Sequence, residues 1–262
     1  MSYLTRNYPV PGLHVLITAG ASGIGAEMAR AFLDVGARVA ICDIDEAALA
    51  RFSEQHPEAL TAVADVSDEA AVNRLVSLIE EEFGRLDVLI KNAGISGPTG
   101  LIEDLEIDDV RKTLEIDLLG QFIVLRAAVP LMKKSGPGSV VNVSSVAGRL
   151  GYAMRTPYAG SKWGIVGLSA SLAKELGPHG IRVNAVLPGI VRGARIDNVI
   201  RDRAEAAGVI FEEMEESLLA NVSLRRMVDA EDVAAAVLFL CSPGGANISG
   251  QALSVCGNVE TL

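Results

Sequence analysis

Tyr158 and Lys162 are the residues of this sequence best suited to proton transfer. They lie four positions apart in a stretch with helical apolar spacing, so they share one face of a helix. A tyrosine is a poor base at neutral pH, because its ordinary pKa is about 10. A neighbouring ammonium favours the phenolate, which could take the proton of an alcohol while a hydride leaves the same carbon. Because this spacing also occurs by chance in amphipathic helices, the other motifs of the sequence must decide whether the pair is catalytic.

Two serines support the chemical interpretation. Ser144 and Ser145 follow the apolar run Ser139–Val143, which has the composition of a buried strand. The carboxyl ends of parallel strands meet at one edge of a sheet. A serine hydroxyl at that edge can donate a hydrogen bond to a substrate oxygen.

A glycine-rich turn indicates a nucleotide site. The run Thr18-Ala19-Gly20-Ala21-Ser22-Gly23-Ile24-Gly25 lies between the first expected strand and the first expected helix. Its glycines let the backbone approach a diphosphate, and the helix N-terminus offers N–H groups to the anion. The alternative is a plain tight turn.

Asp43 bears on the choice of cofactor. It lies at the end of the next expected strand, directly after Cys42 and 18 residues after Gly25. A carboxylate there can accept hydrogen bonds from both adenosine ribose hydroxyls and would repel a 2′-phosphate, which favours NAD over NADP. No Arg or Lys lies in the turn or directly after Asp43 to offset that repulsion. The alternative role, a helix N-cap, can be filled by Asp45.

The elements that must position these residues alternate between strands and helices. The expected strands are His14–Thr18, Arg38–Cys42, Leu60–Ala64, Asp87–Ile90, Ser139–Val143, Ile181–Leu187 and Ala252–Val255. The expected helices are Gly23–Val35, Asp45–Gln55, Asp68–Phe83, Asp108–Lys134, Tyr158–Leu176 and Asp229–Leu240. This alternation predicts an α/β fold, a doubly wound parallel sheet with helices on both faces, as a single domain over residues 1–262.

One stretch breaks the alternation. Ile190–Val228 reads as a long loop, and loops of this length are often functional lids. Its acidic cluster, Glu212, Glu213, Glu215 and Glu216, is expected to form a solvated helix face.

Composition excludes several classes of function. Apolar residues make up 50% of the 262 residues and charged residues 21%, which suits a globular core rather than disorder. The net charge of −10 leaves no basic patch for nucleic acid and disfavours anionic lipid. No apolar run is long enough to span a membrane, and the N-terminal MSYLTRNYPVPG lacks the apolar core of a signal peptide. Three scattered cysteines fit neither a disulfide framework nor a zinc site, so no metal and a cytoplasmic location are expected.

Taken together, these motifs resemble the short-chain dehydrogenase/reductase family. The resemblance rests on the glycine turn, Asp65, Asn92-Ala93-Gly94, Asn142-Val143-Ser144-Ser145, Tyr158-x-x-x-Lys162, and Asn184 through Pro188-Gly189. It implies a Rossmann fold, an NAD(P) cofactor and often a tetramer. It also implies Tyr158 as general acid/base, Lys162 on the nicotinamide ribose and beside the phenol, and Ser145 on the reacting oxygen. Ser145 is preferred to Ser144 because it lies 13 residues before Tyr158, the usual spacing in the family.

The resemblance and the strand ends together define the expected site. The catalytic residues are Ser145, Tyr158, Lys162 and Asp117. Cofactor binding is assigned to Gly20, Ser22, Gly23, Ile24, Gly25, Asp43, Asp65, Val66, Asn92, Ala93, Gly94, Tyr158, Lys162, Pro188, Gly189 and Val191. Substrate binding is assigned to Ser145, Arg155, Tyr158 and Arg195. The two arginines could hold a carboxylate, sulfonate or phosphate; the alternative is that they form surface or intersubunit ion pairs.

Several positions depart from the family pattern. Ala19 replaces a glycine, which is tolerable if φ is negative there and Gly20 absorbs the strain. Asp117 replaces an asparagine that in the family holds a water in a proton relay to the lysine, and a carboxylate can still accept from water. Lys91 also replaces an asparagine, so Lys91 and Asp117 are predicted to form a compensating ion pair, unless the two changes are independent. Gly193 replaces a threonine, and Cys256-Gly257-Asn258 departs near the C-terminus.

The sequence therefore predicts an NAD-dependent oxidoreductase acting on a secondary alcohol or its ketone. Polar small molecules are the expected substrates: polyols, sugars or hydroxy acids. The alternatives are a catalytically weak NAD-binding sensor or scaffold, and a protein of another Rossmann branch. A homotetramer or homodimer is expected, because the helices Asp108–Lys134 and Tyr158–Leu176 carry apolar residues around much of their circumference.

Overall fold

A seven-stranded parallel sheet forms the centre of the protein. The computed structural model describes residues 11–259, and the strand order is β3-β2-β1-β4-β5-β6-β7. The strands are β1 His14–Thr18, β2 Arg38–Asp43, β3 Leu60–Val63, β4 Val88–Lys91, β5 Gly138–Val143, β6 Ile181–Pro188 and β7 Ala252–Val255. All seven predicted strands are present, with ends shifted by a residue at most, and the predicted doubly wound sheet is confirmed. The order reverses beside β1, and in such sheets this reversal marks the ligand crevice.

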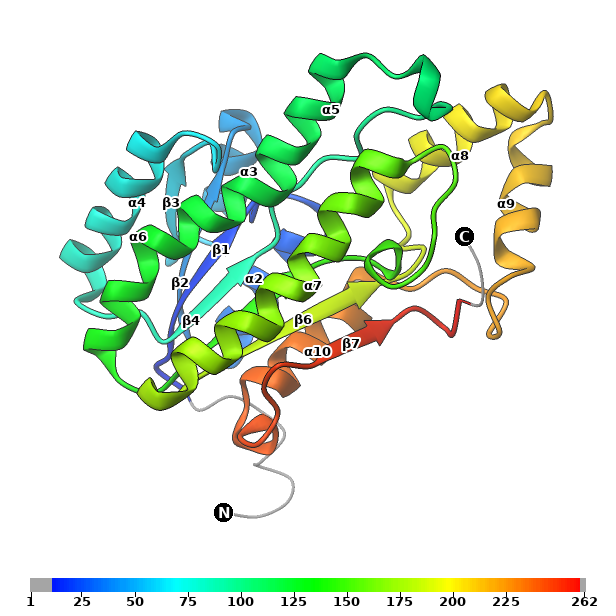
Figure 1. Ribbon diagram of the computed structural model, residues 1–262. Helices are drawn as coiled ribbons and strands as arrows, with labels where there is room; N and C mark the ends of the chain where they lie inside the picture. The colour runs from blue at the N-terminus through cyan, green and yellow to red at the C-terminus, as the bar shows by residue number, and fades with distance from the viewer. Residues whose placement is uncertain (1–10, 260–262) are drawn as a thin grey trace.

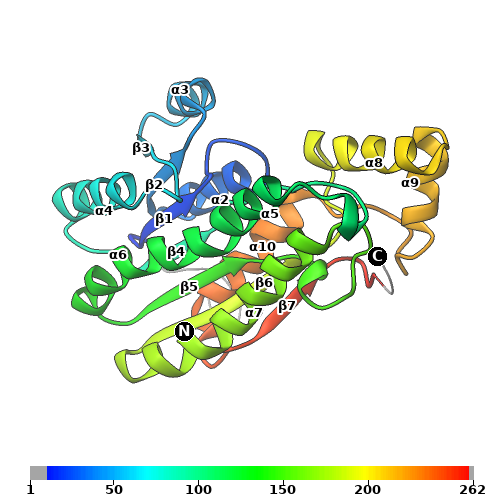
Figure 2. The ribbon, with the colours of Figure 1, turned by 45° about the horizontal axis from the view of Figure 1, so that its top comes forward.

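Helices cover both faces of the sheet (Figures 1 and 2). One face is covered by α2 Gly23–Asp34, α3 Glu46–Gln55 and α10 Ala230–Cys241. The other is covered by α4 Glu69–Phe83, α6 Gly120–Ser135 and α7 Thr156–Leu176. Within β1, Val15 and Ile17 enter the first core and Leu16 the second, because successive strand side chains point to opposite faces.

The helix predicted over Asp108–Lys134 is interrupted. It consists of α5 Ile107–Leu114, a π-helical segment Glu115–Leu119, and α6. The apolar periodicity continues through all three parts, so the sequence shows one helix where the backbone changes type. π-Helical turns are often found at functional sites, and this one contains Asp117.

The segment predicted as a long loop contains two helices. These are α8 Ala194–Ala207 and α9 Phe211–Leu219, which lie beyond the carboxyl ends of β6 and β7 (Figure 1). They are highly charged, which hides their apolar periodicity in the sequence. A small core of Ile190, Ile200, Leu218, Val222, Met227 and Val259 holds the segment together. Glu212, Glu213 and Glu216 are exposed, as predicted, and Glu215 is half-buried.

Further expectations from the sequence concern membrane spans, metal sites, the cysteines and the N-terminal stretch, and residues 11–259 are described. In that range no helix is both long and apolar enough to cross a bilayer. The same residues contain no group of three or more His, Cys, Asp or Glu placed to hold a metal ion. Cys42, Cys241 and Cys256 are free thiols. Most of the N-terminal stretch expected not to be a signal peptide lies outside the described residues.

Candidate active site

The glycine-rich turn connects β1 to α2 and is held by its neighbours. The Asn92 side chain donates to the carbonyl oxygen of Ala19 (3.0 Å), and the Gly20 amide donates to the Cys42 carbonyl (3.0 Å). A Cβ at Gly25 would lie 2.0 Å from the Ala19 oxygen, so that position must be glycine. The turn therefore passes very close to the start of α2.

The start of α2 is suited to a diphosphate. Ser22 is the N-cap but makes no side-chain cap hydrogen bond, so the first N–H groups of the helix are not used by a side chain there. Gly23 has a φ of +53°, and a Cβ placed on it would meet nothing within 4 Å. An uncapped helix N-terminus beside open space fits an anionic group.

Ala19 corrects one expectation. Its φ is +49°, in the left-handed region, and Gly20 is not among the positive-φ residues. The methyl group is therefore tolerated at positive φ, at a cost of about 1 kcal/mol, and the Asn92 hydrogen bond helps to hold it. Gly20 is needed for a different reason, since a Cβ there would lie 2.6 Å from Cβ of Ile41.

Asp43 ends β2 and faces the glycine turn. Its carboxylate accepts from the amides of Ala21 (3.2 Å) and Asp45 (3.2 Å). Asp45 caps α3 by accepting from the Ala48 amide (2.9 Å), so Asp43 is not the cap. The carboxylate is thus held beside the glycine turn.

Asp65 and Val66 follow β3. One carboxylate oxygen of Asp65 accepts from both the amide and the hydroxyl of Ser67 (2.8 and 2.7 Å). Val66 is buried, and a Cβ at Gly120 would lie 3.0 Å from its methyl group. Asp65 therefore shapes this turn in addition to any contact with adenine.

The residues after β4 lie between the glycine turn and two of the predicted catalytic residues, Asp117 and Lys162. The amides of Asn92 and Ala93 both donate to the Thr18 hydroxyl (3.0 and 3.1 Å). At Gly94, a Cβ would lie 3.0 Å from Asp117 Oδ1 and 3.1 Å from Lys162 Nζ. Gly94 thus borders the two buried charges of the site.

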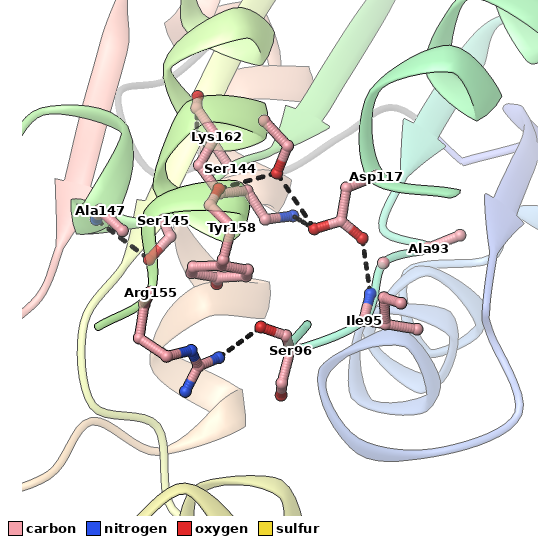
Figure 3. A network of polar contacts seen from close by, with 12 residues as sticks. Ala93, Ile95, Ser96, Asp117, Ser144, Ser145, Ala147, Arg155, Tyr158 and Lys162 are labelled. Atoms are coloured by element: carbon pink, nitrogen blue, oxygen red, sulfur yellow. Dashed lines mark hydrogen bonds and ion pairs between the residues drawn. The ribbon is translucent and has the colours of Figure 1, made fainter. Parts of the chain in front are cut away.

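The two serines after β5 have different surroundings. The Ser144 hydroxyl donates to the carbonyl oxygen of Lys162 (2.8 Å), and Ser144 is buried. The Ser145 hydroxyl accepts from the Ala147 amide (3.2 Å), which leaves its own proton available. Figure 3 shows Ser145 on one side of the Tyr158 ring and Asp117 on the other. This geometry distinguishes Ser145 from Ser144 independently of spacing.

Tyr158 and Lys162 lie in the first turns of α7. The Lys162 ammonium is 5.3 Å from the centre of the Tyr158 ring. Lys162 is buried and Tyr158 is half-buried, and Ser161 donates to the Tyr158 carbonyl oxygen (2.7 Å). The pair predicted from the sequence is therefore together in space.

Asp117 completes this group from the π-helical segment. Its carboxylate is fully buried, accepts from the Ile95 amide (2.6 Å) and the Ser161 hydroxyl (3.2 Å), and lies 3.7 Å from Lys162 Nζ (Figure 3). The π turn directs the carboxylate towards α7. Asp117 therefore contacts the lysine directly.

The predicted ion pair between Lys91 and Asp117 is wrong. Lys91 is buried, and its ammonium donates to the Gln121 carbonyl oxygen (3.2 Å). Among the described residues, no ion pair includes Lys91, and the partner of Asp117 is Lys162. Burial lowers the pKa of Lys91 well below its ordinary value. The two departures from the family pattern therefore do not form a compensating ion pair.

The residues that follow β6 are held by backbone contacts with later parts of the chain. Pro188 ends β6, the Gly189 amide donates to the Val255 carbonyl (2.9 Å), and Val191 forms a bridge with Val228. A Cβ at Gly189 would lie 2.8 Å from Cα of Cys256. Gly193 has a φ of +142°, a conformation that explains glycine where the family has threonine.

Arg155 and Arg195 come together at Ser96. Arg155 is 2% exposed and donates to the Ser96 carbonyl oxygen, while Arg195 donates to the Ser96 hydroxyl (3.2 Å) and the Gly94 carbonyl (3.1 Å). Arg155 is not a surface residue, which excludes a surface ion pair for it. The sequence analysis missed Arg203 of α8, whose guanidinium lies over the Tyr152 ring. Arg203 could have been placed near Arg195 only if α8 had been predicted as a helix.

Comparisons with known proteins identify the family. A family model described as enoyl-(acyl carrier protein) reductase matches residues 18–258. Trans-4-hydroxycyclohexanecarboxylate dehydrogenase of Sinomonas cyclohexanicum is 35% identical over 92% of this chain and 90% of its own. The structure of a single-substitution variant of actinorhodin polyketide ketoreductase with NADPH aligns with a TM-score of 0.91 and 33% identity, covering 96% of this chain and 98% of the other. NAD⁺-bound xylitol dehydrogenase aligns with a TM-score of 0.91 and 29% identity, covering 94% and 98%. The chain belongs to the short-chain dehydrogenase/reductase family of oxidoreductases.

Proposed function

We propose that this protein is an NAD-dependent oxidoreductase that interconverts a secondary alcohol and a ketone on a polar small molecule. The observation that carries the proposal is the grouping of Ser145, Tyr158, Lys162 and Asp117 at the carboxyl ends of β4 and β5. Relatives with names of alcohol or sugar dehydrogenases support the same class of reaction. The substrate is a polyol, a sugar or a hydroxy acid.

Each side chain has a distinct part in the proposed reaction. In the oxidative direction, Tyr158 as phenolate takes the hydroxyl proton, and Ser145 donates a hydrogen bond to the same oxygen. Lys162 stabilises the phenolate by its charge, and Asp117 holds the lysine in place. When bound, the nicotinamide supplies the acceptor for the hydride. The proton leaves Tyr158 for solvent, so the alcohol loses one hydride and one proton in total.

The chain's own residues favour NAD over NADP. Asp43 would face the ribose 2′-oxygen, and a carboxylate there accepts from a hydroxyl but repels a phosphate. The glycine turn would hold the diphosphate with N–H groups at the start of α2. The relatives of known structure include both NAD⁺- and NADPH-bound proteins, so the preference rests on Asp43.

A screen with a matched variant tests the proposed activity. Polyols, sugars and hydroxy acids would be incubated with NAD, and NADH would be followed by its absorbance. We expect turnover of at least one substrate, and Tyr158→Phe should remove nearly all of it while NAD binding, measured by calorimetry, is retained.

The same screen examines the second candidate, an NAD-binding sensor or scaffold. The departures at Ala19, Lys91, Asp117 and Gly193 are the observations that favour it. Tight NAD binding with no turnover of any alcohol or ketone would support this second function. A rate that is equal in the protein and in Tyr158→Phe would contradict the proposed catalytic role.

A further inference from the structure

Two arginines lie over the rings of Tyr152 and Tyr158, and a third shares Ser96 with one of them. The guanidinium carbon of Arg155 lies 5.3 Å from the ring centre of Tyr158 and 5.5 Å from that of Tyr152. The guanidinium carbon of Arg203 lies 5.4 Å from the Tyr152 ring centre. The two tyrosine rings meet edge to face, with centres 6.4 Å apart. Arg155, Arg195 and Arg203 are called the arginine cluster below.

Two separate segments supply this cluster, and a third holds it. Arg155 lies just before α7, whereas Arg195 and Arg203 belong to α8. Arg155 and Arg195 both donate to Ser96, one to its carbonyl oxygen and the other to its hydroxyl. Side chains from the catalytic helix and from the segment beyond β6 are therefore brought to one place.

The positive charge of the cluster is not balanced by protein groups. Within residues 11–259, no carboxylate is in ion-pair distance of any of the three guanidinium groups. Nε of Arg155 and Nη1 of Arg203 are buried, and neither has a hydrogen-bond partner. Burying such donors without partners is costly. The arrangement occurs in a chain of net charge −10, where carboxylates are plentiful.

The pKa of Arg155 reflects the same lack of a carboxylate partner. Burial lowers the pKa of Arg155, and the charges of Arg195 and Arg203 lower it further, against the opposite influence of Tyr152 and Tyr158. A bound anion would reverse these effects. It would also supply an acceptor for the two unpartnered donors.

We propose that the arginine cluster binds an anionic oxygen group, in the first place a carboxylate, carried by the same molecule whose alcohol reacts at Tyr158. This inference rests on the proposed function and narrows its substrate class to hydroxy acids and keto acids. Guanidinium groups pair with carboxylates through two parallel hydrogen bonds. Arg195 is exposed and Arg203 is half-buried, so both are open to an incoming ligand. Arg155 is buried and lies beside the Tyr158 ring.

The contact between Arg155 and Tyr158 limits the length of the substrate. Because the guanidinium lies over the catalytic ring, the anionic group and the reacting carbon must be close together in one small molecule. Short or cyclic hydroxy acids meet this condition. Long-chain acids with distant hydroxyls do not.

Matched pairs of substrates test the proposal. Each hydroxy acid, beginning with 3-hydroxybutyrate and 4-hydroxypentanoate and continuing to cyclic hydroxy acids, is compared with its primary amide, which has the same shape without the charge. We expect kcat/KM for the best acid to exceed that of its amide about a hundredfold, mostly through KM. Arg203→Gln should reduce this preference about tenfold.

A neighbouring arginine provides the control. Arg201 is on the same helix, but its guanidinium bonds Asn198 and lies over the Phe211 ring, outside the cluster. Arg201→Gln should leave the acid-to-amide preference unchanged. An equal fall in both variants would show that the effect is on α8 as a whole and would overturn the proposal.

Other outcomes separate this inference from the proposed function. If neutral alcohols are oxidised in a Tyr158-dependent manner while acids and amides react equally, the anion site is wrong and the oxidoreductase stands. If no alcohol reacts, protection against thermal unfolding by the same hydroxy acids, lost in Arg203→Gln, would support the anion site alone. A rise in KM for NAD in Arg203→Gln with an unchanged acid preference would assign the cluster to the cofactor diphosphate and overturn the proposal.

Discussion

The carboxylate of Asp117 lies 3.7 Å from the ammonium of Lys162, and both side chains are buried. An asparagine at this position could neither balance the charge of the lysine nor form an ion pair. The carboxylate also accepts from the Ile95 amide and the Ser161 hydroxyl, so its place is fixed from three sides. Lys162 in turn lies beside Tyr158, which makes the ion pair part of the electrostatic environment of the phenol.

Substitution of Asp117 tests this arrangement. Asp117→Asn keeps the acceptor oxygen, so we expect activity to stay within about tenfold, or ~1.4 kcal/mol of activation free energy. Removing the anion favours the phenolate of Tyr158, so the pH–rate profile should move to lower pH. Asp117→Leu leaves buried donors unpaired and should cost much more. Unchanged rates and profiles in both variants would make Asp117 a tolerated helix residue.

Lys162 should affect both chemistry and cofactor binding. Lys162→Ala removes the ammonium beside Tyr158 and leaves the Asp117 carboxylate buried without its counter-ion, which is costly. We expect loss of turnover and weaker NAD binding, measured by steady-state kinetics and by calorimetry. Tyr158→Phe is the comparison, since it should affect turnover only. NAD affinity equal in the two variants would exclude the proposed contact of Lys162 with the cofactor.

Cofactor preference should depend on Asp43. Asp43→Ser combined with Ile44→Arg replaces a repelling carboxylate with a cation directly after β2, where Ile44 is 70% exposed. NADP affinity should rise and NAD affinity should fall, each by about tenfold. Ile44→Gln alone should change neither. Equal binding of both cofactors by the unmodified protein would remove the basis of this prediction.

Lys91 should make stability depend on pH. Burial lowers its pKa in the folded protein below the ordinary 10.5. Between the folded and unfolded values the unfolded chain binds a proton that the folded chain lacks, so the free energy of unfolding should rise with pH. Lys91→Met should reduce that slope and stabilise the protein at pH 7 by about 1–3 kcal/mol. Thermal unfolding from pH 7 to 10 measures this, with the exposed Lys174→Met as control; an unchanged slope would contradict it.

The exposed apolar residues of α6 and α7 predict self-association. Phe122 and Trp163 are 49% and 51% exposed, and Leu119 in the π-helical segment is 50% exposed. Leu125, an apolar residue of the same predicted helix Asp108–Lys134, is buried and cannot take part. We expect a homotetramer or homodimer by sedimentation velocity. Phe122→Glu with Trp163→Glu should dissociate it, whereas Val63→Glu on β3 should not; a monomeric unmodified protein at micromolar concentration would refute the prediction.

The fold was predictable because its signals are local. Each strand is a short apolar run, and capping residues such as Asp45 and Asp68 mark the starts of α3 and α4. Features that depend on three-dimensional packing were not predictable. The positive φ at Ala19 is accompanied by a hydrogen bond from the distant Asn92 side chain, and Asp117 meets Lys162 from a π turn that leaves no mark in the apolar periodicity.

The arginine cluster shows the same limit at the candidate site. Arg155 and Arg195 could be proposed from their positions near the site, but Arg203 could not, because α8 was read as a loop. Its short apolar stripe, Ile196, Val199, Ile200 and Ala204, lies among many charged residues, so the helical periodicity was not recognised in the sequence. The pairing of Arg155 with Ser96 joins residues 59 positions apart, a contact that spacing cannot supply.

The π-helical turn has a consequence for the two helices that it joins. Each residue advances an α-helix by about 100°, so the wider turn changes the rotational phase between α5 and α6. Thr113, at the end of α5, can then face Gly97, where a Cβ would lie 2.7 Å from its hydroxyl. At the same time α6 keeps its apolar stripe towards α4. The π-helical turn thus lets α5 and α6, which form one continuous helical segment, pack against two differently oriented partners.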